Sequence, residues 1–378
     1  MKKFLSALFV GLGWVIVSSG PGQADERADA ARVADQIAQA AKKDNFDAAK
    51  YFHGKNIRVI VGFAAGGGTD LQARHFASHW SDYIPGKPRF TVVNITPNLS
   101  AANRLAASPP DGLTLEMTAG SDIIAQFEDA QAKYKAEENR VIGTHNGSSS
   151  TLFARKDFPY RTMADAINGT TPLRIGARGP TDAYVMRLAA LSEWLHIPMK
   201  FISGLSGTAE NLIALERGDT DGYIPGGGGG VWYSLPTIRP GWLKDGTIRV
   251  FAITGPEDIK IGPNRELETP DAPYAGELIK DPEHKKLYDI MTRADTLYGK
   301  IWIAPPKTPD NVINVLRASY EALLEDKVFA QKLEEMMGEP IHLTRGEEVE
   351  KEMKSIVKGY AENAEKFKQW QTWAQERF

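Results

Sequence analysis

Gly66-Gly-Gly-Thr-Asp70 combines residue types that could hold an anion. Glycine permits positive φ angles and leaves backbone N–H groups uncovered, and threonine and aspartate are favoured where a helix begins. Free N–H groups and the positive end of a helix then face one point, which suits a phosphate or a carboxylate. The spacing matches neither the GxGxxG fingerprint nor a phosphate-binding loop that ends in Gly-Lys-Ser/Thr. A tight turn without a ligand is the alternative.

The flanking segments predict how these residues are positioned. Residues 57–61 are apolar and rich in β-branched side chains, which predicts a buried strand, and helical spacing follows the glycines. Two more strands are expected over 90–94 and 113–118, and the polar loops after them contain Asn98 and Ser121. Because the carboxyl ends of parallel strands converge on one crevice, we expect these loops to lie beside the glycine bend.

A similar pattern recurs later in the chain. The strand expected over 173–177 leads into Arg178-Gly-Pro-Thr-Asp182, and an amphipathic helix follows. The strand expected over 199–202 leads into Ser203-Gly-Leu-Ser-Gly-Thr208, which includes Ser206. The two patterns predict an α/β fold with two lobes that face each other across a crevice, a common place for a small-molecule site.

Two features near the second pattern have more than one interpretation. Arg178 could contact a carboxylate through its guanidinium or could face solvent. Five consecutive glycines begin at Gly226 and exclude a helix or a packed strand. They fit a hinge as well as they fit a close approach of the backbone to a ligand.

The side chains that could do catalysis or bind a metal form no coherent set. His75 and His79 share a helical face, but the zincin pattern needs glutamate at position 76, where phenylalanine stands. Ser206 lacks the GxSxG context of a catalytic serine. Asp70 and Asp182 could act as acid and base across the crevice, but helix capping is the preferred explanation. We expect no enzyme, no cofactor and no metal.

Composition and the N-terminus indicate where the protein works. With 378 residues, 42% of them hydrophobic, the chain can form two lobes with proper cores, and a net charge of −3 predicts no nucleic-acid partner. Met1-Lys-Lys3, an apolar stretch to about Val17 and small residues up to Ala24 predict a signal peptide cleaved after Ala24. The apolar stretch is short of a membrane span, so we expect a periplasmic protein. The absence of cysteine excludes disulfides and thiolate metal sites.

Several motifs occur in a characteristic order: Gly62-Phe-Ala-Ala-Gly-Gly-Gly-Thr-Asp-Leu-Gln-Ala-Arg74, Pro109-Pro-Asp-Gly-Leu-Thr-Leu115, Phe158-Pro-Tyr-Arg-Thr162, Leu215-Glu-Arg-Gly-Asp-Thr-Asp221 and Ile303-Ala-Pro-Pro-Lys-Thr-Pro309. Through them the chain resembles, over about residues 55–345, the substrate-binding proteins of tripartite tricarboxylate transporters, the Bug/TctC-type family. The resemblance implies a type II periplasmic-binding-protein-like fold, with two α/β lobes joined by crossing strands around a ligand cleft. We expect a signal peptide over 1–24, a helical extension over 25–50, lobe 1 over 51–150 and 297–378, and lobe 2 over 151–296.

The resemblance also implies a function. The protein would be a monomer that captures a small organic acid by hinge closure and passes it to the membrane subunits of a transporter. A sensory protein that feeds a receptor kinase and a secreted enzyme are the alternatives. In the family, the loop after the first strand and its counterpart in the second lobe hold a ligand carboxylate. With the other strand-end loops, the candidate contacts are Ala65, Gly66, Gly67, Gly68, Thr69, Asp70, Asn98, Ser121, Arg178, Gly179, Thr181, Asp182, Ser206 and Gly226.

The chain departs from the family pattern in its loops. The loop after the second strand, Thr96-Pro-Asn-Leu-Ser100, is not glycine-rich as it usually is in the family. Pro180 removes one backbone N–H group from the counterpart loop of the second lobe. The identity of the ligand therefore does not carry over from the family.

Overall fold

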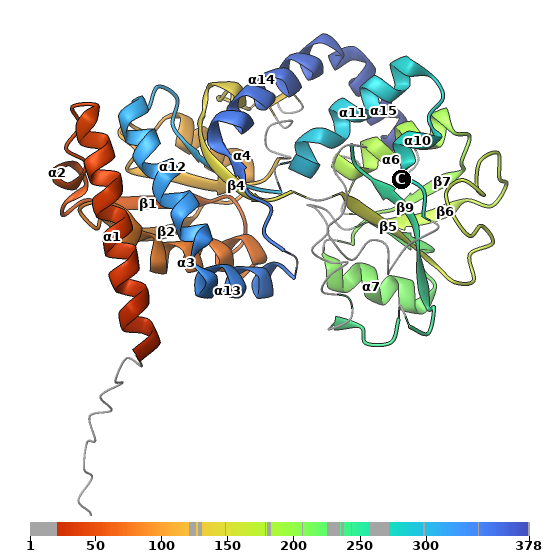
Figure 1. Ribbon diagram of the computed structural model, residues 1–378. Helices are drawn as coiled ribbons and strands as arrows, with labels where there is room; N and C mark the ends of the chain where they lie inside the picture. Colours follow the sequence, from red (N-terminus) through yellow and green to blue (C-terminus); the bar gives the residue numbers. More distant parts are fainter. Residues whose placement is uncertain are drawn as a thin grey trace, which may run out of the picture.

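The computed structural model describes residues 21–120, 126–127, 131–147, 149–177, 179, 183–205, 207–224, 235, 238–242, 244–256, 272–297, 299–338 and 340–376. Two β-sheets with helices packed on them lie side by side (Figure 1), as expected for a two-lobed α/β fold. We call the six-stranded sheet with its helices the first lobe, and the five-stranded sheet with its helices the second lobe.

The first lobe is built on three parallel strands. Its sheet has the order β11-β4-β10-β3-β1-β2, with β1 parallel to both β2 and β3 and β10 antiparallel to β3 and β4. The strands are β1 (Asn56–Val61), β2 (Arg89–Asn94), β3 (Thr114–Thr118), β4 (Arg140–Asn146), β10 (Lys300–Ala304) and β11 (Thr344–Arg345). Because β1, β2 and β3 are parallel, the loops that follow them leave the sheet at one edge, which we call the carboxyl edge.

The second lobe has a mixed sheet in the order β7-β6-β8-β5-β9. β6 is parallel to β7 and β8, and β5 is antiparallel to β8 and β9. The strands are β5 (Ser150–Arg155), β6 (Leu173–Gly176), β7 (Met199–Ile202), β8 (Gly222–Tyr223) and β9 (Ile248–Thr254). β6 leads along the chain toward residues 178–182, the segment that the sequence predicts as the ligand loop of the second lobe.

The helices cover both sheets. They are α1 (Pro21–Lys43), α2 (Ala48–Phe52), α3 (Gly68–His79), α4 (Asn98–Ala106), α6 (Ala183–Trp194), α7 (Thr208–Arg217), α10 (Ala275–Leu278), α11 (Pro282–Leu297), α12 (Asp310–Glu325), α13 (Lys327–Met337), α14 (Gly346–Glu362) and α15 (Ala364–Gln375). In the part of the chain that the structure describes, none of them is long and apolar enough to span a bilayer.

Aromatic side chains fix α3 against the first sheet. The ring of Phe76 on α3 lies 5.1 Å from that of Trp302 on β10 and 5.6 Å from that of Tyr320 on α12, centroid to centroid. Trp80, directly after α3, is fully buried, and its Nε1 donates a hydrogen bond of 2.9 Å to the Ser319 hydroxyl. Burial of such large side chains contributes about 2–3 kcal/mol each. The start of α3 is therefore held rigidly relative to the sheet.

The chain passes between the lobes along closely packed segments. β4 ends in the first lobe and β5 begins in the second, while the chain returns through α11 into β10. Gly299 donates a backbone hydrogen bond of 3.2 Å to the carbonyl of Asn146, and a Cβ on Gly299 would lie 2.1 Å from Asn146 Oδ1. The two connections thus touch at the point where they leave the first sheet.

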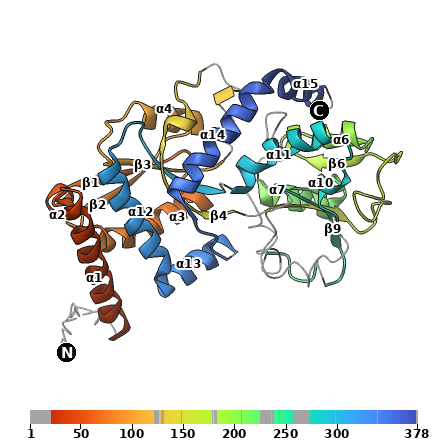
Figure 2. The same ribbon diagram turned by 45° about the horizontal axis from the view of Figure 1, so that its top comes forward.

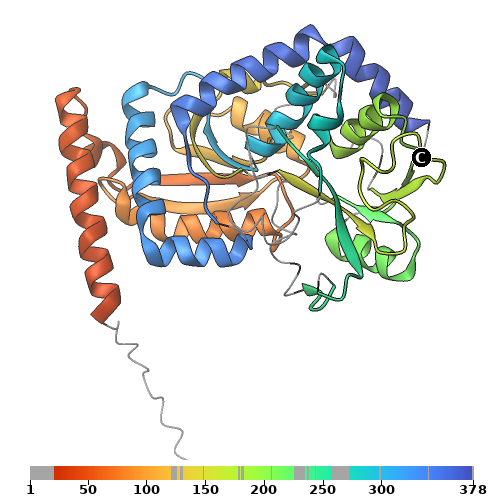
Figure 3. The ribbon, with the colours of Figure 1, turned by 45° about the vertical axis from the view of Figure 1, so that its right-hand side comes forward.

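The C-terminal helices contact both lobes (Figures 2 and 3). α14 packs on β4, whereas α15 packs on α6 of the second lobe. The rings of Trp370 and Trp194 meet edge to face at 4.9 Å, and Trp370 Nε1 donates to Glu193. The sequence places all of 297–378 in lobe 1, and that boundary stays a prediction; Trp370 and Ala374 of α15 pack against the second lobe.

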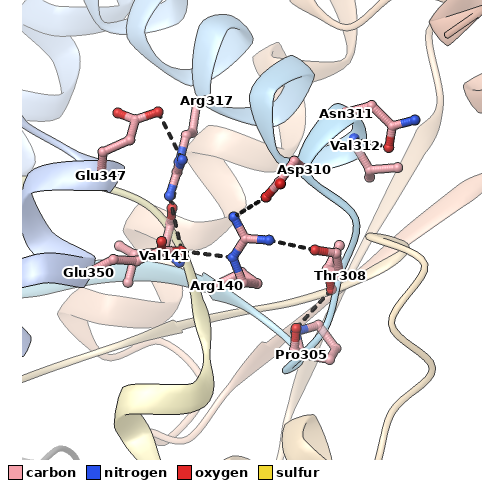
Figure 4. Close-up of polar contacts among 10 residues, drawn as sticks. All are labelled: Arg140, Val141, Pro305, Thr308, Asp310, Asn311, Val312, Arg317, Glu347 and Glu350. Atoms are coloured by element: carbon pink, nitrogen blue, oxygen red, sulfur yellow. Dashed lines mark hydrogen bonds and ion pairs between the residues drawn. The ribbon is translucent and has the colours of Figure 1, made fainter. Parts of the chain in front are cut away.

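A network of ion pairs attaches the start of α14 to the first lobe (Figure 4). Arg317 on α12 is buried, donates to the carbonyl of Val141 at 2.8 Å and pairs with Glu347 and Glu350 of α14. Glu350 Oε1 also accepts hydrogen bonds from Arg140 Nε at 3.0 Å and from the Val141 N–H at 2.8 Å. Both arginines are thus neutralised, and β4, α12 and α14 form one unit.

Replacing Gly346, the first residue of α14, with alanine is expected to destabilise this unit. The new Cβ would lie 2.3 Å from the carbonyl oxygen of Val141 and 2.5 Å from Arg317 Nε. We expect the free energy of unfolding to fall by about 2 kcal/mol, as is usual for overpacking. Gly68→Ala is the matched control: Gly68 is the first residue of α3, and its Cβ would meet nothing within 4 Å. Urea titrations that give equal stability for both variants would contradict this account.

Candidate functional site

The glycine bend connects β1 to α3 at the carboxyl edge of the first sheet. Gly66 has a φ of +78°, which favours glycine, and the Gly67 N–H bonds to the carbonyl of Ala64 at 3.1 Å. α3 begins at Gly68 with Gly67 as its N-cap, so it starts earlier than the sequence suggested. Thr69 and Asp70 therefore lie in the first turn and do not cap the helix.

Asp70 holds the bend in shape. Its side chain is 1% exposed, and its two oxygens accept hydrogen bonds from Gly66 N at 2.8 Å, Asn94 Nδ2 at 2.9 Å and Arg74 Nε at 3.0 Å. Burial raises the pKa of Asp70, but the hydrogen bonds from Arg74, Gly66 and Asn94 together hold it below the ordinary value. The carboxylate is thus charged and fully used within the protein. The side chain of Asp70 therefore shapes the bend, while its backbone N–H stays a predicted ligand contact.

The N–H groups that can receive a ligand lie at the start of α3. Leu71 N donates to the carbonyl of Gly67 at 2.9 Å and closes the first helical turn. The preceding N–H groups of a helix have no acceptor within it. For Gly68, Thr69 and Asp70, the structure gives no other acceptor among the residues it describes. The N–H groups of Gly66 and Gly67 are occupied internally, so the free donors of the bend are those of Gly68, Thr69 and Asp70, which are among the predicted contacts.

The loop after β2 lies beside the bend, as the parallel strands require. Ile95 N donates to the carbonyl of Val61 at 2.9 Å, and α4 begins at Asn98. A Cβ on Gly62 would lie 2.9 Å from both Cα and Oδ1 of Asn98. Asn98 is half-buried, and exposed Ala65 belongs to the bend itself. The candidate contacts of the first lobe that the structure describes are therefore gathered at one edge.

The second lobe supplies one described candidate, Gly179, which follows β6 and is partly exposed. The other predicted contacts lie outside the described residues: Ser121, Arg178, Thr181, Asp182, Ser206 and Gly226. They stay predictions, as does the acid–base pairing of Asp70 with Asp182.

Two supporting residues were missed by the sequence reasoning. Asn94, the last residue of β2, donates from Nδ2 to the carbonyl of Phe63 at 3.0 Å as well as to Asp70. Arg74 donates from Nη2 to Asn94 Oδ1 at 3.1 Å. The sequence could have indicated Asn94, because an amide side chain at the end of an apolar strand is unusual enough to suggest a role at the strand end. The pairing with Arg74 depends on neighbouring strands, which residue spacing does not reveal.

A buried histidine joins α3 to the strand that leads out of the lobe. His145 on β4 is fully buried; its Nε2 lies 3.2 Å from Gln72 Oε1, and its Nδ1 lies 2.9 Å from the Tyr320 hydroxyl. Because Gln72 Oε1 only accepts, Nε2 carries the proton and Nδ1 accepts from Tyr320. Burial, with a smaller effect from the charge of Lys300, lowers the pKa of His145 from 6.5 to about 3. The imidazole is neutral at any ordinary pH.

The histidines on α3 have packing partners. The ring of His75 stacks on Phe329 of α13 at 4.4 Å and lies 4.7 Å from the ring of His79. His75 Nε2 lies 3.3 Å from the Phe329 carbonyl oxygen, and burial lowers the pKa of His75. Among the described residues, no three His, Cys, Asp or Glu side chains form a group that could hold a metal ion.

Comparison with known proteins gives one curated relative. A UPF0065 protein of Bordetella pertussis is 26% identical over 183 residues, which cover 45% of this chain and 54% of that protein. The chain thus matches about half the length of this relative. No protein-family model matches the chain.

Solved structures share the fold over most of the chain. A TctC solute-binding protein from Polaromonas, without ligand, has a TM-score of 0.62 at 20% identity and covers 82% of this chain and 98% of its own. The periplasmic binding protein BugD has a TM-score of 0.56 at 21% identity, and the match covers 83% of this chain and 97% of BugD. MatC from Rhodopseudomonas palustris, with bound malate, has a TM-score of 0.55 at 20% identity, and the match covers 85% of this chain and 99% of MatC. Fold and relative together confirm the resemblance to Bug/TctC-type solute-binding proteins that the sequence motifs indicate.

Proposed function

We propose that the protein is a periplasmic solute-binding protein that captures a small organic acid by its carboxylate. The observation that carries the proposal is the start of α3, where the N–H groups of Gly68, Thr69 and Asp70 have no acceptor among the described residues. The side chain of Asp70, whose two oxygens accept three hydrogen bonds, fixes the bend that presents them. The positive end of a helix of this length favours an anion at that point.

The geometry suggests how affinity arises. A hydrogen bond from a backbone N–H to a charged carboxylate contributes about 1.5–3 kcal/mol when the acceptor is desolvated. Two such bonds contribute about 3–6 kcal/mol, which does not offset the cost of association by itself, so further contacts are needed for micromolar affinity. We propose that the second lobe completes the site by closing over the ligand, with the paired connections at Asn146 and Gly299 as the hinge. The loop over 178–182 would then supply the opposing contacts.

The comparisons support a carboxylate as the ligand. MatC, which shares the fold over 85% of this chain, was solved with malate. We further propose export to the periplasm after cleavage at Ala24, within the segment that forms α1, and delivery of the ligand to the membrane subunits of a transporter. We propose the lobe boundaries given by the sequence, except that α15 rests on the second lobe.

Isothermal titration calorimetry of the purified protein against mono- and dicarboxylates tests the proposal. The protein is also titrated after unfolding, dialysis and refolding, because a bound acid from the host cell would mask binding. We expect saturable heat with at least one carboxylate and none with the corresponding amide. Binding of the amide alone, or of no carboxylate after refolding, would overturn the proposed function.

Gly68→Pro removes a single proposed donor without disturbing the helix. Proline is favoured at the first helical position, and Gly67 has the extended ψ of 164° that a residue before proline requires. We expect carboxylate affinity to fall about 10- to 100-fold, which corresponds to one charged hydrogen bond. Gly68→Ala keeps the N–H and should bind as the wild type does. Equal affinity of the two variants in calorimetry would show that the Gly68 N–H does not contact the ligand.

A further inference from the structure

A pocket in the second lobe lies away from the loop that follows β6. It has a volume of about 500 Å³ and is formed where β5 ends, where β9 begins and where α7 ends. β5 is antiparallel to β8, and β8 is parallel to β6, so β5 ends at the edge of the sheet opposite to the carboxyl end of β6. The volume is within the range of about 300–1,000 Å³ that is usual for small-molecule sites. The pocket is thus separate from the carboxylate site that we propose.

Ion pairs and hydrogen bonds hold the walls of this pocket. Arg155, the last residue of β5, donates to the two carboxylate oxygens of Asp157 at 2.8 Å and 2.6 Å. It also donates to the Leu215 carbonyl on α7 at 2.5 Å, which ties the strand to the helix. Glu216, the next residue of α7, pairs with Arg239 at 2.9 Å. Because the walls are fixed by contacts within the protein, the pocket is formed before a ligand arrives, which lowers the cost of binding.

Trp242 provides an aromatic wall. It is half-buried, and the Cζ atom of Arg239 lies 5.5 Å from the centroid of its ring, which restrains the indole. The buried side chains of Leu215 and Ile248 also line the pocket. The flat ring of a ligand can stack on an indole and gains more from this contact than from burial of apolar surface alone. The pocket therefore favours an aromatic ligand over an aliphatic one.

Lys156 provides a charge for a ligand. Its backbone is fixed, because its N–H donates to the Thr247 carbonyl at 3.0 Å and its carbonyl accepts from Arg249 Nη1 at 2.5 Å. Its exposed side chain lines the pocket, and among the described residues its ammonium has no hydrogen-bond or ion-pair partner. A Cβ on Gly246 would lie 3.6 Å from Lys156 Nζ, which places the ammonium over the turn that precedes β9.

We propose that this pocket binds an aromatic anion with a single negative charge, of the aryl carboxylate class, independently of the site on α3. Lys156 contacts the acidic group of the ligand, and Trp242 contacts its ring. Asp157 and Glu216 are paired with arginines, but their carboxylates line the same pocket and disfavour ligands with several negative charges. The inference does not rest on the proposed function, because it concerns other residues and another face of the molecule.

The test follows the signal of Trp242 itself. The protein is labelled with 5-fluorotryptophan, and the fluorine NMR signal that is missing from Trp242→Phe is assigned to Trp242. Indole-3-acetate and its uncharged amide are then titrated as probes. We expect a saturable shift of the Trp242 signal with the acid and an affinity about 10-fold lower for the amide, which lacks the charge that Lys156 recognises.

Matched lysine variants test the charge. Lys156→Gln should lower the affinity for the acid to that for the amide. Lys244→Gln is the control, because Lys244 is exposed in the neighbouring turn and does not line the pocket, and it should bind both probes as the wild type does. Wild-type affinity for the acid in Lys156→Gln, or equal affinity of the wild type for acid and amide, would overturn the inference.

Gly68→Pro separates this pocket from the site on α3. The Trp242 signal should shift with unchanged affinity in this variant, since the Gly68 N–H belongs to the other lobe. Loss of the shift in Gly68→Pro would attribute it to a ligand bound at α3 and overturn the inference, as would the absence of a shift with the acid at millimolar concentration. Tighter binding of adenosine monophosphate than of indole-3-acetate would contradict the preference for a single charge. Calorimetry with aliphatic carboxylates decides the proposed function separately.

Discussion

Asp70→Ala is expected to abolish measurable carboxylate binding and to lower the free energy of unfolding by about 3 kcal/mol. The substitution removes an acceptor from the Gly66 N–H and from the Asn94 amide, which keeps the Phe63 carbonyl, while Arg74, 48% exposed, remains solvated. Hydrogen bonds to a charged group contribute about 1.5–3 kcal/mol each. The bend then loses the geometry that aims the first N–H groups of α3, so affinity should fall by more than about 100-fold.

Two further variants make this prediction specific. Asp70→Asn keeps one acceptor oxygen and the shape of the side chain, so it should fall between wild type and alanine in both affinity and stability. Asp82→Ala is the control, because Asp82 forms an ion pair with Lys87 at 3.3 Å in which both side chains are substantially exposed. Exposed pairs of this kind contribute about 0–1 kcal/mol. Calorimetry showing wild-type affinity in Asp70→Ala would remove this residue from the account of the site.

The sequence was informative where local chemistry decides the structure. The β-branched run over 57–61 and the glycines after it predicted a strand and a bend, and β1 and the bend occur there. Parallel strands with polar loops predicted one convergent edge, which the pairing of β1 with β2 and β3 confirms. Such features follow from side-chain periodicity and turn chemistry within a few residues of one another.

It was uninformative where distant segments meet. Asp70 was interpreted as a helix cap because its type suits a cap, but its acceptor role depends on Asn94, which arrives from the neighbouring strand. Lys300 lies far from Phe63 in the sequence, and the position of β10 in the sheet brings them together. The position of α15 on the second lobe likewise follows from the apolar face of Trp370 meeting Trp194. Composition and residue spacing do not indicate which residues from distant segments make contact.

Buried polar groups in the first lobe link the proposed site to the connection between the lobes. Gln72 follows the free N–H groups by two residues, and His145 directly precedes Asn146, where the two connections touch. In the closure that we propose, a movement of β4 would reach α3 through the hydrogen bond between His145 and Gln72. Because the imidazole is neutral, that bond is independent of pH in the folded protein until strongly acidic conditions.

The neutrality of His145 has a large consequence for stability. In the unfolded chain the imidazole takes up a proton below about pH 6.5, whereas in the folded protein its pKa is about 3. Between these values the unfolded state binds the additional proton, so the free energy of unfolding falls as the pH falls. The loss is about 1.4 kcal/mol for each pH unit, or about 3 kcal/mol between pH 7 and pH 4.5. His75 and His342, whose pKa values are also lowered by burial, act in the same direction.

His145→Gln should remove this part of the pH dependence. Glutamine can still donate to Gln72 and accept from Tyr320, but it does not titrate. The free energy of unfolding of the variant at pH 7 should be lower than that of the wild type. Between pH 6 and pH 4.5, however, it should fall less steeply with pH, by close to one proton per molecule. Urea titrations at half-unit pH steps measure both quantities. His53→Gln, at an exposed position, should reproduce the wild-type slope. If His145→Gln and wild type lose stability in parallel as the pH falls, His145 is not the buried neutral group that joins α3 to β4.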